Sequence, residues 1–470
     1  MDSNDPETAR EGRRRGDHDV DVRDKVDKLS SLPNPILHCI FSFVPTIDVV
    51  RCSLLSRRWR YFWTSMPFLD IDHCYFWSPH IKFGNQLEFG VKFTNFVTSV
   101  LMFRDGSDIQ RFRLSSFIYC SKWVDMWVTV LMSHNVKELD LTVCPEESMV
   151  LPQCLADSDH LETLKLNLFN HVLVMPRPMM GRFSKLSSLH LISVRFPDSN
   201  SARMLFLRCK LLEHLVLDRC IYENMRVLII RAINLKTLTI DNVGMGNDDS
   251  TKTGLKIFAP NLLSLKVMGP KAWDYDLQDT ASLTDVCVQL FIGFKTRREG
   301  GISCPMYKLF TGFHSTKFMK LHIDLLQFYL PKINAPDCFP APFQNLEFVK
   351  LYTGADKRNL EFILHLLQHS PMLETLAIDF KECDRNNRWE SEDKAVACLM
   401  YCLKTIEIGN FEGQENILEL IRFLLRNGCL LEKMTITWSL NVEKPMEIIE
   451  NGLAIMAFPK ASSDVSITFL

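Results

Sequence analysis

Residues 161–166 read L-E-T-L-K-L, and the same six-residue pattern, L-x-x-L-x-L, returns along most of the chain. Successive matches lie 21 to 35 residues apart. Their first positions are Ile109, Val136, Leu161, Leu186, Leu212, Leu235, Leu262, Leu283, Phe318, Leu346, Leu373, Leu403 and Leu431. One match alone would carry little weight, but regular recurrence is typical of a repeat protein, in which each unit buries its apolar face against its neighbours.

The last four residues of each match alternate apolar and polar side chains, which predicts a β-strand with one buried face. The residues between matches would return the chain through a helix or a loop, so the stacked units should form an α/β solenoid. The pattern resembles the leucine-rich repeats of plant F-box proteins, which implies a parallel sheet on the concave side of a curved array. The asparagine of the commonest repeat consensus is mostly absent, so we expect irregular repeats.

The polar positions between the buried leucines should line the concave face. The candidate target-binding residues on this face are Arg111, Arg113, Lys266, Lys320, His322, Lys350 and Tyr352. The predicted face carries both signs of charge, and Asp285 and Asp324 argue against a phosphate pocket, which needs several converging Arg or Lys side chains. A protein-only interface is therefore favoured over a bound small molecule.

The segment 27–72 carries more apolar surface than a module of its size can bury. Helices are predicted to begin at Asn34, which can cap the first, at Thr46, which can cap the second, and at Ser56. About 45 residues enclose only a modest core, because small domains bury a small fraction of their surface. The surplus apolar face should therefore dock on a partner.

This segment resembles the F-box of plant proteins, in which a Leu-Pro start, an Ile-Leu pair, a Ser-x-Leu-Ser-x-Arg-Trp core and a distal tryptophan recur. The residues in these places are Leu32, Pro33, Ile36, Leu37, Ser53, Leu55, Ser56, Arg58, Trp59 and Trp63. The family usually has an acidic pair where this chain has Asn34 and Pro35, so a favourable charge at the helix start, worth about 0.3–1 kcal/mol, is lost.

The candidate adaptor-binding residues are Leu32, Pro33, Ile36, Leu37, Ile40, Val49, Leu54, Leu55, Trp59 and Trp63. On this hypothesis, replacing Leu32 and Trp59 together by Ala should abolish adaptor binding and leave the repeats folded.

The rest of the chain divides by composition and pattern. Residues 1–26 are highly charged and should be disordered. Residues 73–108 should form a linker and an amphipathic helix that caps the solenoid, which spans 109–400. Candidate contact loops are 242–258, 290–315, 331–343 and 381–397.

Residues 401–470 resemble the FBD region that follows the repeats in many plant F-box proteins. The resemblance is carried by the run 402–436 and by the ending F-P-K-A-S-S-D-V-S-I-T-F-L at 458–470. The residues themselves predict a strand, a helix ending at Asn427 and Gly428, and a second strand. Such a unit should complete the end of the solenoid as an FBD-like cap.

Composition and motifs argue against several other classes of protein. With 470 residues, 47% hydrophobic content and a formal net charge of −2, the chain gives no bulk attraction to nucleic acid or to an anionic membrane. No segment is apolar enough for export or membrane insertion, so a soluble protein of the cytoplasm or the nucleus is expected. Common nucleotide, zinc and nucleophile motifs are absent, so no catalytic residue, cofactor or metal is predicted.

Taken together, the predicted function is that of a non-catalytic substrate-recognition subunit of a Skp–cullin–F-box ubiquitin ligase. The resemblance supplies the partners, which are a Skp-family adaptor, a cullin bound through it, and an unidentified target protein. Two alternatives remain open. One is a repeat scaffold that binds an adaptor outside a ligase, and the other is a small-molecule receptor that uses the concave face.

Overall fold

The computed structural model describes residues 29, 31–76, 86–119, 121–176, 182–241, 254–270, 275–291, 305–322, 339, 341–381, 388–390, 396–440 and 445–470. The predicted disordered tail at 1–26 lies outside these ranges, as do half of the predicted contact loop 290–315 and the greater parts of the other three loops. Two stretches predicted as loop are regular structure instead. Residues 254–258 form a strand and residues 305–311 form a helix.

Helices alternate with parallel strands in the first and last parts of the described chain, whereas strands follow one another from β7 to β14. The helical segments are α1 (Asn34–Phe41), α2 (Thr46–Cys52), η1 (Phe62–Ser65), η2 (His73–Phe76), α3 (Gln86–Met102), α4 (Ser121–Ser133), α5 (Gln153–Asp157), α6 (Ser199–Arg208), α7 (Pro305–Thr311), α8 (Lys357–Gln368), α9 (Ala397–Tyr401), α10 (Glu415–Asn427) and α11 (Pro445–Met456). The strands are β1 (Phe68–Asp72), β2 (Arg111–Tyr119), β3 (Glu138–Cys144), β4 (Ser148–Val150), β5 (Thr163–Val174), β6 (Ser188–Phe196), β7 (His214–Asp218), β8 (Ile221–Tyr222), β9 (Val227–Arg231), β10 (Thr237–Asp241), β11 (Gly254–Phe258), β12 (Ser264–Pro270), β13 (Tyr275–Gln278), β14 (Asp285–Phe291), β15 (Phe318–His322), β16 (Phe348–Gly354), β17 (Thr375–Lys381), β18 (Thr405–Phe411), β19 (Lys433–Trp438) and β20 (Ser466–Phe469).

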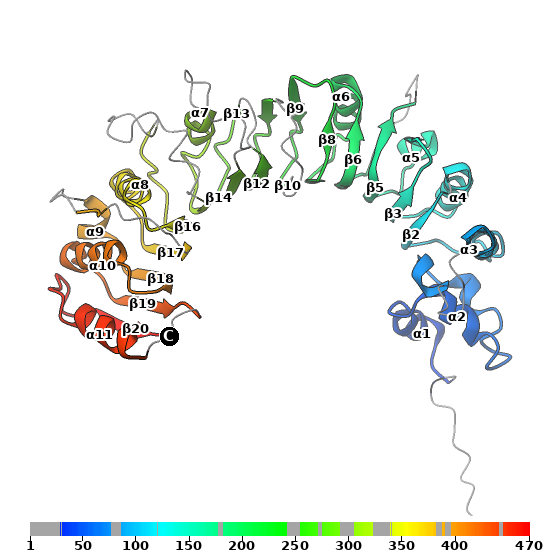
Figure 1. Ribbon diagram of the computed structural model, residues 1–470. Coiled ribbons are helices and arrows are strands. Elements are labelled where there is room, and N and C mark those ends of the chain that lie inside the picture. The colour runs from blue at the N-terminus through cyan, green and yellow to red at the C-terminus, as the bar shows by residue number, and fades with distance from the viewer. Residues whose placement is uncertain are drawn as a thin grey trace, which may run out of the picture.

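The chain forms an arch with strands on its inner side and helices on its outer side (Figure 1). Helices α1 and α2 lie at one end of the arch, and α11 and β20 lie at the other. Seventeen strands in the described part of the chain join into a single sheet, in which each pairing is parallel. The predicted α/β solenoid with a parallel sheet on its concave side is therefore confirmed.

The repeat pattern sets the register of this sheet. Leu139, Leu164 and Leu189 pair across β3, β5 and β6, and all three side chains are buried. The equivalent buried residues continue through β12 and β14 as Leu265 and Val286. Apolar rows that stack in this way make one continuous core, so each unit depends on the units beside it.

The predicted match at Phe318 is out of register by two residues. Phe318 is the first residue of β15, where it pairs with Phe348 of β16, and its side chain is 44% exposed. The buried first position of this unit is Thr316. Because the pattern L-x-x-L-x-L requires an apolar residue at its first position, it does not match Thr316 and is displaced to Phe318.

The sheet also begins earlier than the pattern predicts. Strand β1 pairs with β2 in parallel, and its Leu69 and Ile71 are buried in the core. The backbone N–H of Asp70 donates a hydrogen bond to Oγ1 of Thr46 on α2 at 2.8 Å. The last residues of the segment 27–72 are therefore part of the solenoid, and this hydrogen bond links the helical module to it.

Part of the convex side is built from strands rather than helices. Strands β9, β11 and β13 form a second, three-stranded parallel sheet, with β11 in the middle. This sheet lies on the outer side of the central part of the arch (Figure 1). In the units between Leu212 and Leu283, the return segment is the extended β9, β11 or β13, and the described residues there contain no helix.

Helices α3 and α10 form where the sequence predicts them, although α3 connects β1 to β2 and does not precede the first strand. Helix α3 buries Phe93, Val97 and Val100 beside the first strands, as the amphipathic pattern predicts. At the other end α10 lies between β18 and β19 in the sequence and ends at its C-cap, Gly428. Helix α11 and strand β20 follow, and β20 pairs with β19 as the last strand of the sheet.

The N-terminus of α8 allows a direct test of local stability. Asp356 is the N-cap of this helix, and its Oδ1 accepts hydrogen bonds from the backbone N–H groups of Arg358 and Asn359. We expect Asp356→Ala to lower the free energy of unfolding by about 1 kcal/mol, since these N–H groups lose their acceptor. Urea unfolding would measure the loss. Arg358→Ala at an exposed position should change it by less than about 0.5 kcal/mol, and equal losses would contradict the assignment.

Candidate functional site

Helices α1 and α2 and the segment up to η1 form a small module with its own buried centre. Leu37 and Phe41 of α1 point inward, and the ring of Phe41 meets Trp59 edge-on at 5.3 Å and Phe62 at 5.4 Å. The guanidinium group of Arg58 donates to the carbonyl oxygen of Leu32. Arg58 also lies 3.5 Å from Oδ1 of Asn34. These contacts fix the start of α1 against the turn that follows α2.

The helix boundaries in this module differ from the prediction in three places. The N-caps of α1 and α2 are Pro33 and Pro45, so Asn34 and Thr46 are the first residues of their helices and do not cap them. The third predicted helix, from Ser56, is reduced to turns and the short η1. The side chains of Asn34 and Thr46 instead accept hydrogen bonds from residues outside their helices, namely Arg58 and Asp70.

The ten predicted adaptor-binding residues fall into two groups. Those that remain accessible are Leu32, Pro33, Ile36, Ile40, Leu54, Leu55 and Trp63, and those buried in the module are Leu37, Val49 and Trp59. The buried three support the module from within and offer no surface to a partner. The double substitution of Leu32 and Trp59 is therefore a poor test of docking, because removing a buried Trp would damage the fold first.

One large apolar side chain on this surface is absent from the prediction. Phe43, in the turn after α1, is 86% exposed, close to the 87% of Leu54. Ile36, Ile40 and Leu55 of the same module are also exposed, and we call these five residues its exposed apolar surface. Exposed apolar groups clustered on one small module are typical of a protein-binding site. Phe43 lies outside the recurring motif positions, so only its exposure identifies it.

Charged residues on the first strands of the concave face are paired with one another. Arg113 on β2 contacts Asp70 at 2.6 Å and Asp72 at 3.3 Å, both on β1. Lys165 on β5 contacts Asp140 on β3 at 3.2 Å. Burial opposes the charge of Arg113, but the hydrogen bond to Asp70 and the nearby carboxylates together raise its pKa. This part of the face is therefore largely neutralised internally.

Further along the arch, lysines gather on neighbouring strands. Lys266, Lys320 and Lys350 occupy one row across β12, β14, β15 and β16, in which Cys287 stands between the first two. Burial raises the pKa of the Cys287 thiol, although Lys266 and Lys320 both act to lower it. We call these three lysines the central lysine row.

The residues that the sequence predicted for target binding therefore separate in space. Arg111 and Arg113 lie on β2 near the first end of the arch, and Arg111 sits 5.7 Å from the ring centre of Phe68. The other five are Lys266, Lys320, His322, Lys350 and Tyr352, on β12, β15 and β16. The sheet thus brings together five of the seven residues and separates the two arginines from them.

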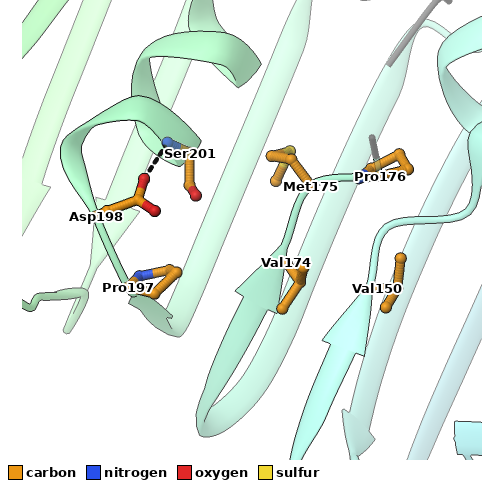
Figure 2. Close-up of a pocket in the computed structure, with 7 residues that line it drawn as sticks. All are labelled: Val150, Val174, Met175, Pro176, Pro197, Asp198 and Ser201. Atoms are coloured by element: carbon orange, nitrogen blue, oxygen red, sulfur yellow. Dashed lines mark hydrogen bonds between the residues drawn. The ribbon is translucent and has the colours of Figure 1, made fainter. Parts of the chain in front are cut away.

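A shallow, mainly apolar pocket opens beside α6, with a volume of about 350 Å³. Figure 2 shows Val150, Val174, Met175 and Pro176 facing the start of the helix. Asp198, which supplies the only charge among the lining residues, accepts a hydrogen bond from the backbone N–H of Ser201 at 2.7 Å. That carboxylate is already used as a helix cap, so the pocket offers little chemistry of its own.

The described residues also contain a close group of potential metal ligands, Asp72, His73 and Cys74. Arg113 lies 3.3 Å from Asp72, so a cation there would meet an existing positive charge. Within the described ranges, no helix is long and apolar enough to cross a lipid bilayer.

Comparison with known proteins agrees with this architecture. Residues 29–71 match the F-box domain, and residues 100–452 match the leucine-rich-repeat domain described as At1g61320/AtMIF1. Among Arabidopsis thaliana proteins, the chain is 26% identical to F-box/FBD/LRR-repeat protein At5g56420, over 87% of this chain and 91% of the relative. It is 27% identical to F-box/FBD/LRR-repeat protein At3g52680, over 91% and 90%.

The fold and these matches define an F-box protein with a repeat domain for protein interaction. The chain belongs to the plant F-box/FBD/leucine-rich-repeat family. F-box domains generally bind Skp1-type adaptors, and the exposed apolar surface of the module lies within the matched residues 29–71.

Proposed function

We propose that this chain is the substrate-recognition subunit of a Skp–cullin–F-box ubiquitin ligase. The observation that carries the proposal is the exposed apolar surface around Phe43 and Leu54, at one end of a repeat arch. An apolar surface of this kind is stabilised when a partner covers it. The adaptor would bind there and leave the concave face of the arch open to a target.

The proposed role is non-catalytic and depends on proximity. The F-box module would fix the chain to the adaptor, and a cullin bound through the adaptor would bring a ubiquitin-conjugating enzyme. A target held by the repeats would then meet that enzyme at a raised effective concentration. The hydrogen bond between Thr46 and Asp70 and the pairing of β1 with β2 join the module to the sheet, which would limit how far the target can move.

Co-purification tests this proposal directly. Tagged full-length chain should retain a Skp-family adaptor and, through it, a cullin. Retention of the adaptor without cullin would favour the alternative of a repeat scaffold that works outside a ligase. Retention of neither would exclude the ligase role, provided that a related F-box protein captures both under the same conditions.

A further inference from the structure

The central lysine row is chemically different from the rest of the concave face. Within the described ranges, Lys266 and Lys320 make no ion pair, whereas Arg113 and Lys165 do. Lys350 contacts Asp379 on β17 at 2.8 Å, and the resulting hydrogen bond outweighs partial burial and raises the pKa of Lys350. Neighbouring strands are about 4.8 Å apart, so Lys266, Lys320 and Lys350 lie within about 15 Å of one another.

Aromatic side chains flank two of the three lysines, Lys320 and Lys350, on both sides along their strands. Phe318 and Phe348 come two residues before Lys320 and Lys350, and their ring centres are 6.3 Å apart. His322 and Tyr352 come two residues after, and they stack at 4.3 Å with an interplanar angle of 11°. Side chains two residues apart point to the same face of a strand, so the aromatic pairs before and after the lysines face the concave side as the lysines do.

This pattern matches the spacing of an extended peptide. Alternate residues of a β-strand are about 6.6–6.8 Å apart, which is also the separation of Phe318, Lys320 and His322 along β15. A peptide lying along this strand could place an acidic side chain opposite the lysines and an apolar or aromatic side chain opposite each aromatic pair.

We propose that Lys266 and Lys320, with the flanking pairs Phe318–Phe348 and His322–Tyr352, form the binding site for an acidic, extended segment of a target protein. The inference rests on one part of the proposed function, which is that the repeats bind the target protein. It adds the chemical class of the target segment and its place on β12, β15 and β16. The carboxylates of the segment would supply the ion pairs that Lys266 and Lys320 do not make within the described chain.

A nucleic acid is the other polyanion that basic and aromatic side chains could bind. Two features favour an acidic peptide. Asp285 lies on β14 and Asp379 on β17, next to β16, so a continuous phosphate backbone across these strands would meet both carboxylates, whereas an extended peptide can place uncharged side chains opposite them. The chain as a whole carries a formal net charge of −2, whereas proteins that bind nucleic acid usually present a strongly basic surface.

The test uses a fluorescein-labelled peptide with the sequence Gly-Tyr-Glu-Glu-Glu-Tyr-Gly and fluorescence polarisation with the full-length chain. Matched peptides carry Gln or Lys in place of Glu. We expect binding of the Glu peptide, at least about tenfold weaker binding of the Gln peptide, and none of the Lys peptide. Raising NaCl from 50 to 300 mM should weaken binding of the Glu peptide, because salt screens exposed charges.

Substitutions assign the binding to this site. Lys266→Glu with Lys320→Glu should weaken binding of the Glu peptide by at least about tenfold, since two attractive charges become repulsive. Lys210→Glu with Lys460→Glu changes the net charge equally at exposed positions elsewhere and should leave binding within about twofold. Asp379→Asn should strengthen binding, because Lys350 would lose its present partner.

Asp379 also has an identifiable structural support. A Cβ on Gly409 of β18 would clash with Oδ1 of Asp379, so only glycine leaves room for the carboxylate in its present position. Gly409→Ala should therefore displace this carboxylate and act in the same direction as Asp379→Asn.

Each outcome decides the proposal. Three results would overturn it. The first is an equal loss of peptide binding in the two lysine double variants, and the second is equal binding of the Glu and Gln peptides. The third is stronger competition by single-stranded DNA than by unlabelled Glu peptide. If the Lys266 and Lys320 variant fails to fold, the peptide series and salt series on wild-type protein still decide. Adaptor retention, measured in parallel, separates the two proposals, because a chain that holds the adaptor and ignores the peptide refutes only the acidic-target site.

Discussion

Replacing Phe43 and Leu54 together by Asp should abolish retention of a Skp-family adaptor. Both side chains are more than 85% exposed, so the substitutions remove no core packing. Burying one large apolar side chain against a partner is worth about 1.5–3 kcal/mol, and each new carboxylate would have to lose its hydration. Together these effects should raise the dissociation constant by at least about 100-fold, which surface plasmon resonance with purified adaptor would measure.

The chain supplies a matched control at its other end. Met446 and Leu453 on α11 are 64% and 66% exposed, and replacing both by Asp makes the same chemical change far from the F-box module. That variant should bind the adaptor as wild type does. Undiminished adaptor binding by the Phe43 and Leu54 variant would show that the adaptor, if bound, uses another surface. Deleting the residues before 73 is not an equivalent control, because it removes β1 and exposes the edge of β2.

Trp127→Ala should cause one of the largest losses of stability in the chain, about 3–5 kcal/mol. Trp127 on α4 is fully buried, and its Nε1–H donates a hydrogen bond to Oγ1 of Thr98 on α3 at 3.0 Å. The substitution leaves a cavity between the two helices and also removes the donor from Thr98. Chemical denaturation should show a lower midpoint, and hydrogen exchange should increase first in α3 and α4.

Trp123 is the matched control on the same helix. It is 45% exposed, one turn before Trp127, so Trp123→Ala removes the same type of side chain without opening an internal cavity. We expect a loss below about 1 kcal/mol. Equal losses in the two variants would mean that the packing between α3 and α4 contributes little to the stability of this end of the arch.

The sequence predicted the strands well because their signal is repeated. Each buried apolar residue pairs with the equivalent residue of the next unit, as Leu376 does with Ile406, so the same period appears many times. The convex strands were missed, because β11 lies in the segment 242–258, whose composition indicated a loop, and β9 lies between two matches, where a helix or a loop was expected. Thr316 was missed for a different reason, since a threonine can fill a buried position that a search for leucine-like residues excludes.

The candidate sites show a different limit. Helical spacing places Ile36, Leu37, Ile40 and Phe41 on one side of the first helix, but it could not distinguish the buried Leu37 and Phe41 from the exposed Ile36 and Ile40. Alternation along the strands showed which residues share the concave face. It could not show that Asp140 neutralises Lys165 while Lys320 makes no ion pair within the described chain, because that depends on which strands become neighbours.

The sheet of β9, β11 and β13 bears on the bending of the arch. Neighbouring strands are about 4.8 Å apart, whereas packed helices need 8–10 Å, so a helical outer layer forces successive units to splay like wedges. Where strands form both layers, the two spacings match and successive units can stack without splaying (Figure 1). The units between Leu212 and Leu283, whose outer layer is the sheet of β9, β11 and β13, therefore lengthen the span between the F-box module and the central lysine row. They help set how large an object the arch can enclose.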